Sequence, residues 1–406
     1  MTRRVRLGAA AGPGLRTVLL LTRRARLGAA ARLSIWAALL LGGWGAGPAY
    51  GEPTFLSKQY PRCTACHYSA SGGGLLTPYG RSLSREEIST FGRQGAGGGP
   101  AGGARGEEGF LFGALTSESP LQLGLDVRPS HVGVDVAGRT LADRNFLMNL
   151  DLQAAWRRDR WTAYGSIGRE PALGGAGPVS YEHWVAYQAT DAISVRGGRF
   201  LPAYGVRFAD HTSFTREGLD LAQDGQVYGV EVGLSTDRTL LQVSAGPGRA
   251  ESLVADDGRR AFTAAGRFQL DVGPRMVVAA SVLHRGASEV DARSLNTGLS
   301  FGYAPVSWLT TWTHLDAGFQ PRTASDRAYI LANQTSVEAF RGVWLRISPQ
   351  RRWTDTDPRG EVRRMVYGLD FYPRTHWHVN LSYYRDHLPL TGVRVRTLLA
   401  QLHLYL

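Results

Sequence analysis

Residues 376–406, HWHVNLSYYRDHLPLTGVRVRTLLAQLHLYL, alternate between apolar and polar side chains in two stretches. In the first stretch one face carries Trp377, Val379, Leu381 and Tyr383, and the other carries His378, Asn380, Ser382 and Tyr384. In the second stretch one face carries Leu398, Ala400, Leu402, Leu404 and Leu406, and the other carries Gln401, His403 and Tyr405. A period of two is typical of a β-strand with one apolar face. The sequence therefore predicts strands over 376–386 and 395–406.

The same alternation begins near residue 121 and continues to the end of the chain. It predicts sixteen strands near 121–135, 144–157, 161–169, 181–189, 192–199, 226–235, 238–246, 260–270, 275–284, 293–303, 307–316, 327–338, 342–349, 363–373, 376–386 and 395–406. In 144–157, one face is expected to carry Phe146, Met148, Leu150, Leu152, Ala154 and Trp156.

Short and long connections alternate between these segments. The short ones are expected at 157–160, 189–192, 235–238, 271–275, 304–307, 340–342 and 372–375, and the longest connection is 200–225. An even strand count with short turns at one end is typical of an outer-membrane barrel, and a sheet in lipid must close on itself. We therefore expect an all-β fold, a 16-stranded antiparallel transmembrane β-barrel over 121–406, in the outer membrane of a Gram-negative bacterium.

Four tryptophans next to the short turns agree with this prediction: Trp156, Trp161, Trp308 and Trp377. Aromatic side chains of barrels gather in girdles at the membrane interfaces. The alternatives are a soluble β-sandwich, which rarely needs sixteen strands, and a propeller, whose blades repeat in sequence. No such repeat is present.

Composition excludes several classes of protein. The chain has 406 residues and a formal net charge of +12, but eight arginines lie in residues 1–51, which contain no acid. The remainder is only weakly basic, so a nucleic-acid partner is not expected. Only one stretch is apolar enough to suggest a membrane helix, which excludes a polytopic helical protein.

Residues 1–51 are predicted to be a signal peptide. A basic region, 23–32, precedes the apolar run 33–41, and small residues at 49 and 51 suggest cleavage before Glu52. A twin-arginine signal at 23–24 is the competing interpretation. Residues 92–120 are expected to form a glycine-rich linker between a short segment, 52–91, and the barrel.

The segment 52–91 contains the pentad Cys63-Thr64-Ala65-Cys66-His67, which uses both cysteines of the chain. C-x-x-C-H is the attachment motif of c-type haem, in which two thiols bind the porphyrin and the histidine binds the iron. The alternatives are a thioredoxin-like redox pair, which needs a βαβ context, and a structural disulfide. The sequence predicts one covalent haem c on Cys63 and Cys66, with His67 as the proximal ligand.

The distal ligand is not evident, because no methionine lies near the pentad and 52–91 contains no second histidine. The segment is also too short to enclose a haem, so we expect the barrel lumen to do so. Strand parity places His378 and His403 on the inward face near the periplasmic mouth. His211, in the 200–225 loop, is a third candidate, and five-coordinate iron remains open.

The pentad, followed by Leu76-Thr77-Pro78-Tyr79-Gly80-Arg81 and a barrel, resembles the fused monohaem cytochrome–porins of the outer membrane. About thirty residues carry this resemblance. It implies a trans-membrane electron carrier that accepts electrons from extracellular ferrous iron and passes them to a periplasmic c-type cytochrome.

The sequence therefore leaves three alternative functions. The first is electron transfer between a periplasmic c-type cytochrome and an extracellular electron donor or acceptor. The second is a solute porin in which 52–91 is a haem-dependent plug or sensor. The third is a peroxidase-like haem enzyme, which needs five-coordinate iron.

Overall fold

The computed structural model describes residues 53–60, 62–91, 119–169, 178–210, 212–219, 221, 225–248, 262–286, 294–319, 327–355 and 360–406. The predicted signal peptide and most of the predicted linker lie outside these residues. Within them, no helix is long and apolar enough to span a membrane.

Strands make up most of the described chain. They are β1 (Leu121–Val136), β2 (Arg139–Arg158), β3 (Trp161–Arg169), β4 (Pro178–Val179), β5 (His183–Gln188), β6 (Ile193–Phe200), β7 (Val227–Ser235), β8 (Thr239–Gly248), β9 (Phe262–Gly273), β10 (Met276–Gly286), β11 (Ser294–Val306), β12 (Leu309–Phe319), β13 (Arg327–Phe340), β14 (Val343–Thr354), β15 (Val362–Phe371), β16 (Trp377–Leu388) and β17 (Val393–Tyr405). The helical turns are η1 (Pro53–Lys58), η2 (Cys63–Ala65), α3 (Pro78–Leu83), η3 (Ser84–Ile88) and η5 (Glu217–Leu219).

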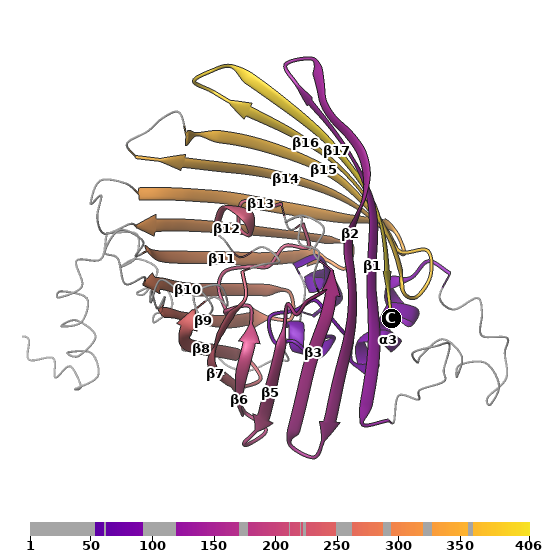
Figure 1. The fold of residues 1–406 in the computed structure, drawn as a ribbon, viewed down its shortest axis with the longest axis vertical. Coiled ribbons are helices and arrows are strands. Elements are labelled where there is room, and N and C mark those ends of the chain that lie inside the picture. The colour runs from indigo at the N-terminus through magenta and orange to yellow at the C-terminus, as the bar shows by residue number, and fades with distance from the viewer. Residues whose placement is uncertain are drawn as a thin grey trace, which may run out of the picture. The chain divides into compact units, whose positions relative to one another are not determined.

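The strands form one closed antiparallel barrel. Neighbours in sequence are neighbours in the sheet, and β1 pairs with β17 to close the ring (Figure 1). The short β4 and the following β5 both pair with β3 and share one position, so the described strands fill sixteen positions. The predicted fold class is confirmed, because sixteen antiparallel strands close on themselves.

The alternation seen in the sequence separates the two faces of this sheet. Outward-facing Leu331 is 41% exposed, whereas its inward-facing neighbour Ala332 is fully buried. On β16, Leu381 is 42% exposed and the inward Ser382 is fully buried. The four tryptophans predicted to form a girdle are 41–50% exposed, so they lie on the outer surface as expected.

The two ends of the barrel differ in their connections. β1 begins and β17 ends at the end with the short turns, which we call the terminal rim; the opposite end is the loop rim. The prediction of long connections at the loop rim was wrong at two places. β1 and β2 are joined by only Ala137 and Gly138, and β16 and β17 by residues 389–392. Both Ala137 and Gly138 have positive φ, which suits a two-residue hairpin turn and lets the paired strands extend further.

The predicted face of β2 was also wrong in its first half. A β-bulge lies between Arg128 and Pro129 of β1, whose partners are Asn149 and Leu147, so Met148 is the extra residue. Proline has no N–H to donate to the ladder, and bulges accommodate it. The extra residue reverses the alternation, so Phe146 and Met148 do not share the outward face of Leu150 and Leu152.

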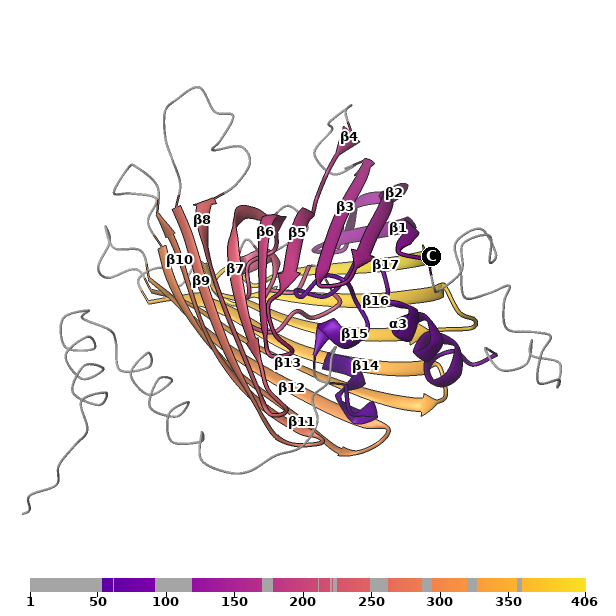
Figure 2. The same cartoon turned by 90° about the horizontal axis from the view of Figure 1, so that it is seen from below.

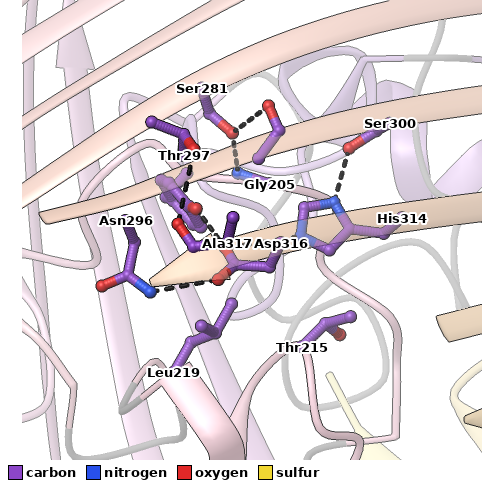
Figure 3. Close-up of polar contacts among 12 residues, drawn as sticks. Gly205, Thr215, Leu219, Ser281, Asn296, Thr297, Ser300, His314, Asp316 and Ala317 are labelled. Atoms are coloured by element: carbon purple, nitrogen blue, oxygen red, sulfur yellow. Dashed lines mark hydrogen bonds and ion pairs between the residues drawn. The ribbon is translucent and has the colours of Figure 1, made fainter. Parts of the chain in front are cut away.

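The connection between β6 and β7 is called the 201–226 loop here, and its described residues (201–210, 212–219, 221, 225 and 226) fold into the interior of the barrel. The Gly205 amide of this loop donates to Ser281 Oγ on β10 (3.0 Å) (Figure 3). In the barrel wall beside it, two polar contacts join β11 and β12: Asn296 Nδ2 donates to Asp316 Oδ1 (3.0 Å), and His314 Nδ1 lies 2.8 Å from Ser300 Oγ. The Tyr204 hydroxyl donates to Asp316. An apolar cluster completes the packing and contains Leu201, Tyr204, Phe214, Leu219, Leu221, Ala265, Leu283 and Ile330. This loop therefore narrows the lumen.

Candidate functional site

Residues 53–91 lie within the ring of strands, at the terminal rim (Figure 2). We call this segment the plug. The Ser57 amide donates to Thr310 Oγ1 on β12 (3.1 Å), and Arg62 Nη2 forms a buried ion pair with Asp271 on β9 (3.0 Å). Near its end, the Thr90 amide donates to the Tyr372 carbonyl (2.9 Å). Further contacts to the strands are made by Lys58, Ser71, Arg81 and Ser84.

The pentad forms a tight turn in the plug. The amides of Cys66 and His67 both donate to the Cys63 carbonyl, at 3.1 and 2.9 Å. Cys63 and Cys66 are half-buried and carry thiols rather than a disulfide. The turn brings the two cysteines and the histidine to one side of a cavity, which all three residues line.

The residues after the pentad hold it in place. Thr77 caps the N-terminus of α3: its hydroxyl accepts from the Gly80 amide (3.1 Å), and its own amide donates to the Cys66 carbonyl (2.8 Å). Pro78 follows at the first helical position, where its missing N–H costs nothing. A Cβ on Gly80 would lie 2.3 Å from the Cys66 carbonyl oxygen, so only glycine allows α3 to approach this closely. This packing gives a physical reason for the Thr-Pro-x-Gly spacing.

Three glycines shape the other side of the turn. Gly72, Gly73 and Gly74 all have φ between 66° and 76°, a conformation that other residues rarely adopt. A Cβ on Gly72 would lie 2.9 Å from the Cys63 sulfur. The chain therefore reverses directly beside the thiol and leaves space next to it.

One backbone contact orients the His67 ring in the plug. Its Nδ1 lies 3.4 Å from the Gly74 carbonyl oxygen, which orients the ring with Nε2 at the opposite side. Burial lowers the pKa of His67 to about 4, so the imidazole is neutral near pH 7 and can offer a lone pair to iron. The donor set of two thiols and one oriented neutral imidazole fits a c-type haem.

The cavity next to the pentad has a volume of about 270 Å³, just below the range of about 300–1,000 Å³ that is usual for ligand sites. Side chains of the barrel wall and of the 201–226 loop form its other sides. Its polar and ionisable wall residues include Asp126, Arg128, Asp151, Glu182, Arg207, Arg216, His378, Gln401 and His403.

Two of the three predicted distal ligands line this cavity. The rings of His378 and His403 are 5.9 Å apart. His378 stacks on Tyr372 at 4.4 Å, and its Nε2 lies 2.9 Å from Asp370 Oδ1. Nε2 of His403 lies 3.3 Å from Asp126 Oδ1. The structure thus brings both histidines to the cavity of the pentad, and their role as ligands stays a prediction; His211 lies outside the described residues.

Besides Arg62 of the plug, three arginines of the cavity wall were not predicted as site residues. Arg128 pairs with Asp126 on β1, at 2.6 Å. Arg207 donates to the Ser71 carbonyl (3.0 Å), and Arg216 is 3.3 Å from the carbonyl of Phe208. Arg207 and Arg216 belong to the longest loop, so their place in the lumen depends on how that loop folds. Arg128 continues the regular alternation of β1, in which Gln122, Asp126 and Ser130 face inward and are buried, so strand parity could have placed it in the lumen.

The comparisons with known proteins support the fold. No known family profile matches the chain, and no curated protein matches its sequence. OprB of Pseudomonas putida is similar in structure, with a TM-score of 0.56 and 10% identity over 70% of this chain and 94% of that chain. OmpT of Vibrio cholerae, an outer membrane protein solved with loop L8 deleted, has a TM-score of 0.51 and 11% identity over 70% of this chain and 99% of that chain. The chain therefore has the closed 16-stranded barrel fold of outer-membrane porins.

Proposed function

We propose that this protein is an outer-membrane electron carrier that holds one haem c inside its barrel. Cys63 and Cys66 form the thioether bonds, and His67 is the proximal ligand. The observation that carries the proposal is the position of the pentad: it lines a cavity within the barrel that His378 and His403 also line. A segment as short as the plug cannot enclose a haem by itself, and the strands surround the cavity next to the pentad.

The residues around the cavity would perform distinct tasks. Thr77 and Gly80 fix the backbone of the pentad, and the Gly74 carbonyl orients His67. Arg207 and Arg216 place positive charge next to the cavity, where an anionic group of the ligand would be stabilised. A bound haem supplies a one-electron carrier whose potential depends on its axial ligands and on its burial.

The barrel orients this carrier across the outer membrane. Short turns of such barrels face the periplasm, so the plug lies at the periplasmic mouth. A periplasmic c-type cytochrome is the partner that this side can reach. On the outer side, the partner is an extracellular electron donor or acceptor, with ferrous iron as the donor that the sequence resemblance implies.

The test is the spectrum of the full-length protein purified from the outer membrane. The wild type should show the absorption bands of a c-type haem that remains bound after denaturation. Cys63→Ala/Cys66→Ala should lose the covalent pigment, and His67→Ala should retain it with altered bands. A colourless wild type, or loss of the pigment from wild type on denaturation, would refute the proposal.

Electron transfer is tested with protein in liposomes that enclose a small cytochrome c. An external reductant too large to enter the barrel should reduce the enclosed cytochrome. Liposomes with the double cysteine variant provide the control. Equal rates for the two proteins would show that the pentad is not part of the electron path.

A solute porin is the second candidate, and the polar lumen of a porin fold favours it. Inward-facing side chains such as Gln269, Asn380 and Ser382 are polar, as in water-filled barrels. The plug and the 201–226 loop both occupy this lumen. A wild type that conducts small ions steadily in a planar bilayer would favour the porin function.

A further inference from the structure

The outer surface of the barrel carries a row of basic side chains near the loop rim. Arg351 of β14 is paired in register with Arg363 of β15, Arg363 with His387 of β16, and His387 with Arg394 of β17. Because adjacent strands are about 4.8 Å apart, these four side chains form a continuous line. The next register position adds Arg385 and Arg396, which are also paired. We call these six residues the basic row.

The basic row points away from the lumen. Its arginines have the same parity as outward-facing residues of the same four strands, namely Leu345 (51% exposed), Tyr367 (42%), Leu381 (42%) and Leu398 (41%). The arginines themselves are exposed. Each of the four strands has apolar or aromatic outward-facing side chains up to this level, and the basic residues follow directly.

The height of the row matches a membrane interface. On β16, Trp377 lies at the terminal rim, and His387 is ten residues further along the strand. Ten residues rise about 34 Å along a strand, or about 24 Å along the axis of a barrel whose strands tilt by about 45°. The apolar band of such barrels is about 25 Å tall. The row therefore lies where the head groups of the outer leaflet begin.

The positive charge of the row is poorly compensated by the protein. Arg351 and Arg363 share one carboxylate oxygen of Glu361, at 2.9 and 2.8 Å. Within the described part of the chain, the side chains of Arg385 and Arg394 form no hydrogen bond or ion pair, and Nδ1 of His387 is buried without a hydrogen-bond partner.

Without a bound anion, the cross-strand register of these basic residues destabilises the sheet by electrostatic repulsion. Arg385 lies directly opposite Arg396, and like charges at such positions destabilise a sheet. On its other side Arg396 is opposite Asp135, whose Oδ1 already accepts from the Gly138 amide (3.0 Å). A negatively charged partner from outside the chain would relieve the repulsion.

The surface next to the row has room for such a partner. An outward-facing concavity of about 620 Å³ is lined by the basic row and, toward the middle of the barrel, by Leu331, Pro349 and Met365. Guanidinium groups bind phosphate through two parallel hydrogen bonds. A lipid has the matching combination, with a phosphorylated head group at one end and an acyl chain at the other.

We propose that the basic row is a binding site for a phosphorylated lipid of the outer leaflet. The phosphate groups contact Arg385, Arg394 and Arg396, and an acyl chain lies over Leu331 and Met365. This inference depends on the outer-membrane placement in the proposed function, but not on the haem. The spectroscopic tests above and the lipid test below can therefore fail independently.

The experiment compares lipid binding by wild type and Arg394→Gln/Arg396→Gln, with the full-length protein in detergent. Native mass spectrometry measures binding of bisphosphorylated lipid A, with the monophosphorylated form and phosphatidylethanolamine as comparison lipids. Each arginine next to a charged lipid contributes about fivefold in affinity, so the double variant should bind about 30-fold more weakly. Arg157→Gln/Arg158→Gln, which removes the same charge at the terminal rim, should bind like wild type.

A charge reversal separates lipid binding from folding. In Arg394→Glu/Arg396→Gln the new carboxylate faces His387, and the glutamine removes the repulsion with Arg385 without opposing Asp135 with a like charge. The barrel should therefore melt at the wild-type temperature or above while lipid binding is lost. Equal lipid affinity in wild type and both double variants would overturn the proposal. Competition by millimolar inorganic phosphate would show a site for soluble anions instead, and a changed oligomeric state with unchanged lipid binding would show an interface between copies.

Discussion

At the scale of single residues, the pentad depends on close backbone contacts that its own sequence does not reveal. Gly80 is in a helix, where glycine costs about 1 kcal/mol relative to alanine. It is nevertheless required, because its Cα faces the Cys66 carbonyl at a distance that leaves no space for a methyl group. The contact energy, rather than helix propensity, decides which residue this position accepts.

Gly80→Ala should therefore weaken the site although it favours the helix. Overpacking against backbone typically costs 1–3 kcal/mol, which exceeds the gain in propensity of about 1 kcal/mol. We expect less covalent pigment per protein and easier protease cleavage within the plug. Gly133→Ala, at a position where a Cβ meets no atom within 4 Å, is the matched control. Equal pigment content in the two variants would contradict this explanation.

At the scale of elements, the 201–226 loop is held in the lumen by a small number of buried polar contacts. Asp316 on β12 accepts hydrogen bonds from the Tyr204 hydroxyl and from Asn296, and it is almost completely buried. Gly205 adds a backbone hydrogen bond to Ser281. These contacts fix the start of the loop against the wall.

Asp316→Ala should release the loop. The substitution leaves the buried Tyr204 hydroxyl without its acceptor, at a cost of about 1–3 kcal/mol, and also removes a partner of the partly buried Asn296 amide. Trypsin added from outside should then cleave after Arg207 or Arg216, which wild type protects. Asp143→Ala, which removes a 69% exposed carboxylate, should leave the loop protected. Protection of the loop in Asp316→Ala would show that other contacts hold it.

The sequence predicted the elements well where one face of a strand is apolar and the other polar, as in β13 to β17. It failed where the chain departs from regular alternation. The bulge at Met148 reverses the faces of β2, and the tight turn at Ala137–Gly138 lets β2 begin at Arg139 rather than at 144, while β1 ends only one residue later than expected. Loop conformations depend on contacts between distant segments, so Arg207 and Arg216 could not be assigned to the cavity from spacing alone. The regular alternation of β1 would have placed Arg128 on the inward face.

At the scale of the whole molecule, the plug closes the barrel because it contacts strands around the ring. Arg62 and Asp271 form its most buried ion pair, with side-chain exposures of 7% and 1%. Lys58 adds a second pair with Glu338. The barrel and plug therefore act as one closed unit, and this closure predicts the electrical behaviour of the protein.

Wild type should conduct poorly in a planar bilayer, and Arg62→Ala should show frequent openings. Removing one partner of a buried pair costs about 3–5 kcal/mol, because Asp271 remains charged in the interior. If this cost destabilises only the plugged state, the unplugged fraction rises by about 10²–10⁴-fold. Arg158→Ala removes an arginine that is 72% exposed at the same rim, and its current should equal that of wild type. Identical traces for wild type and Arg62→Ala would show that the 201–226 loop, rather than the plug, blocks the lumen.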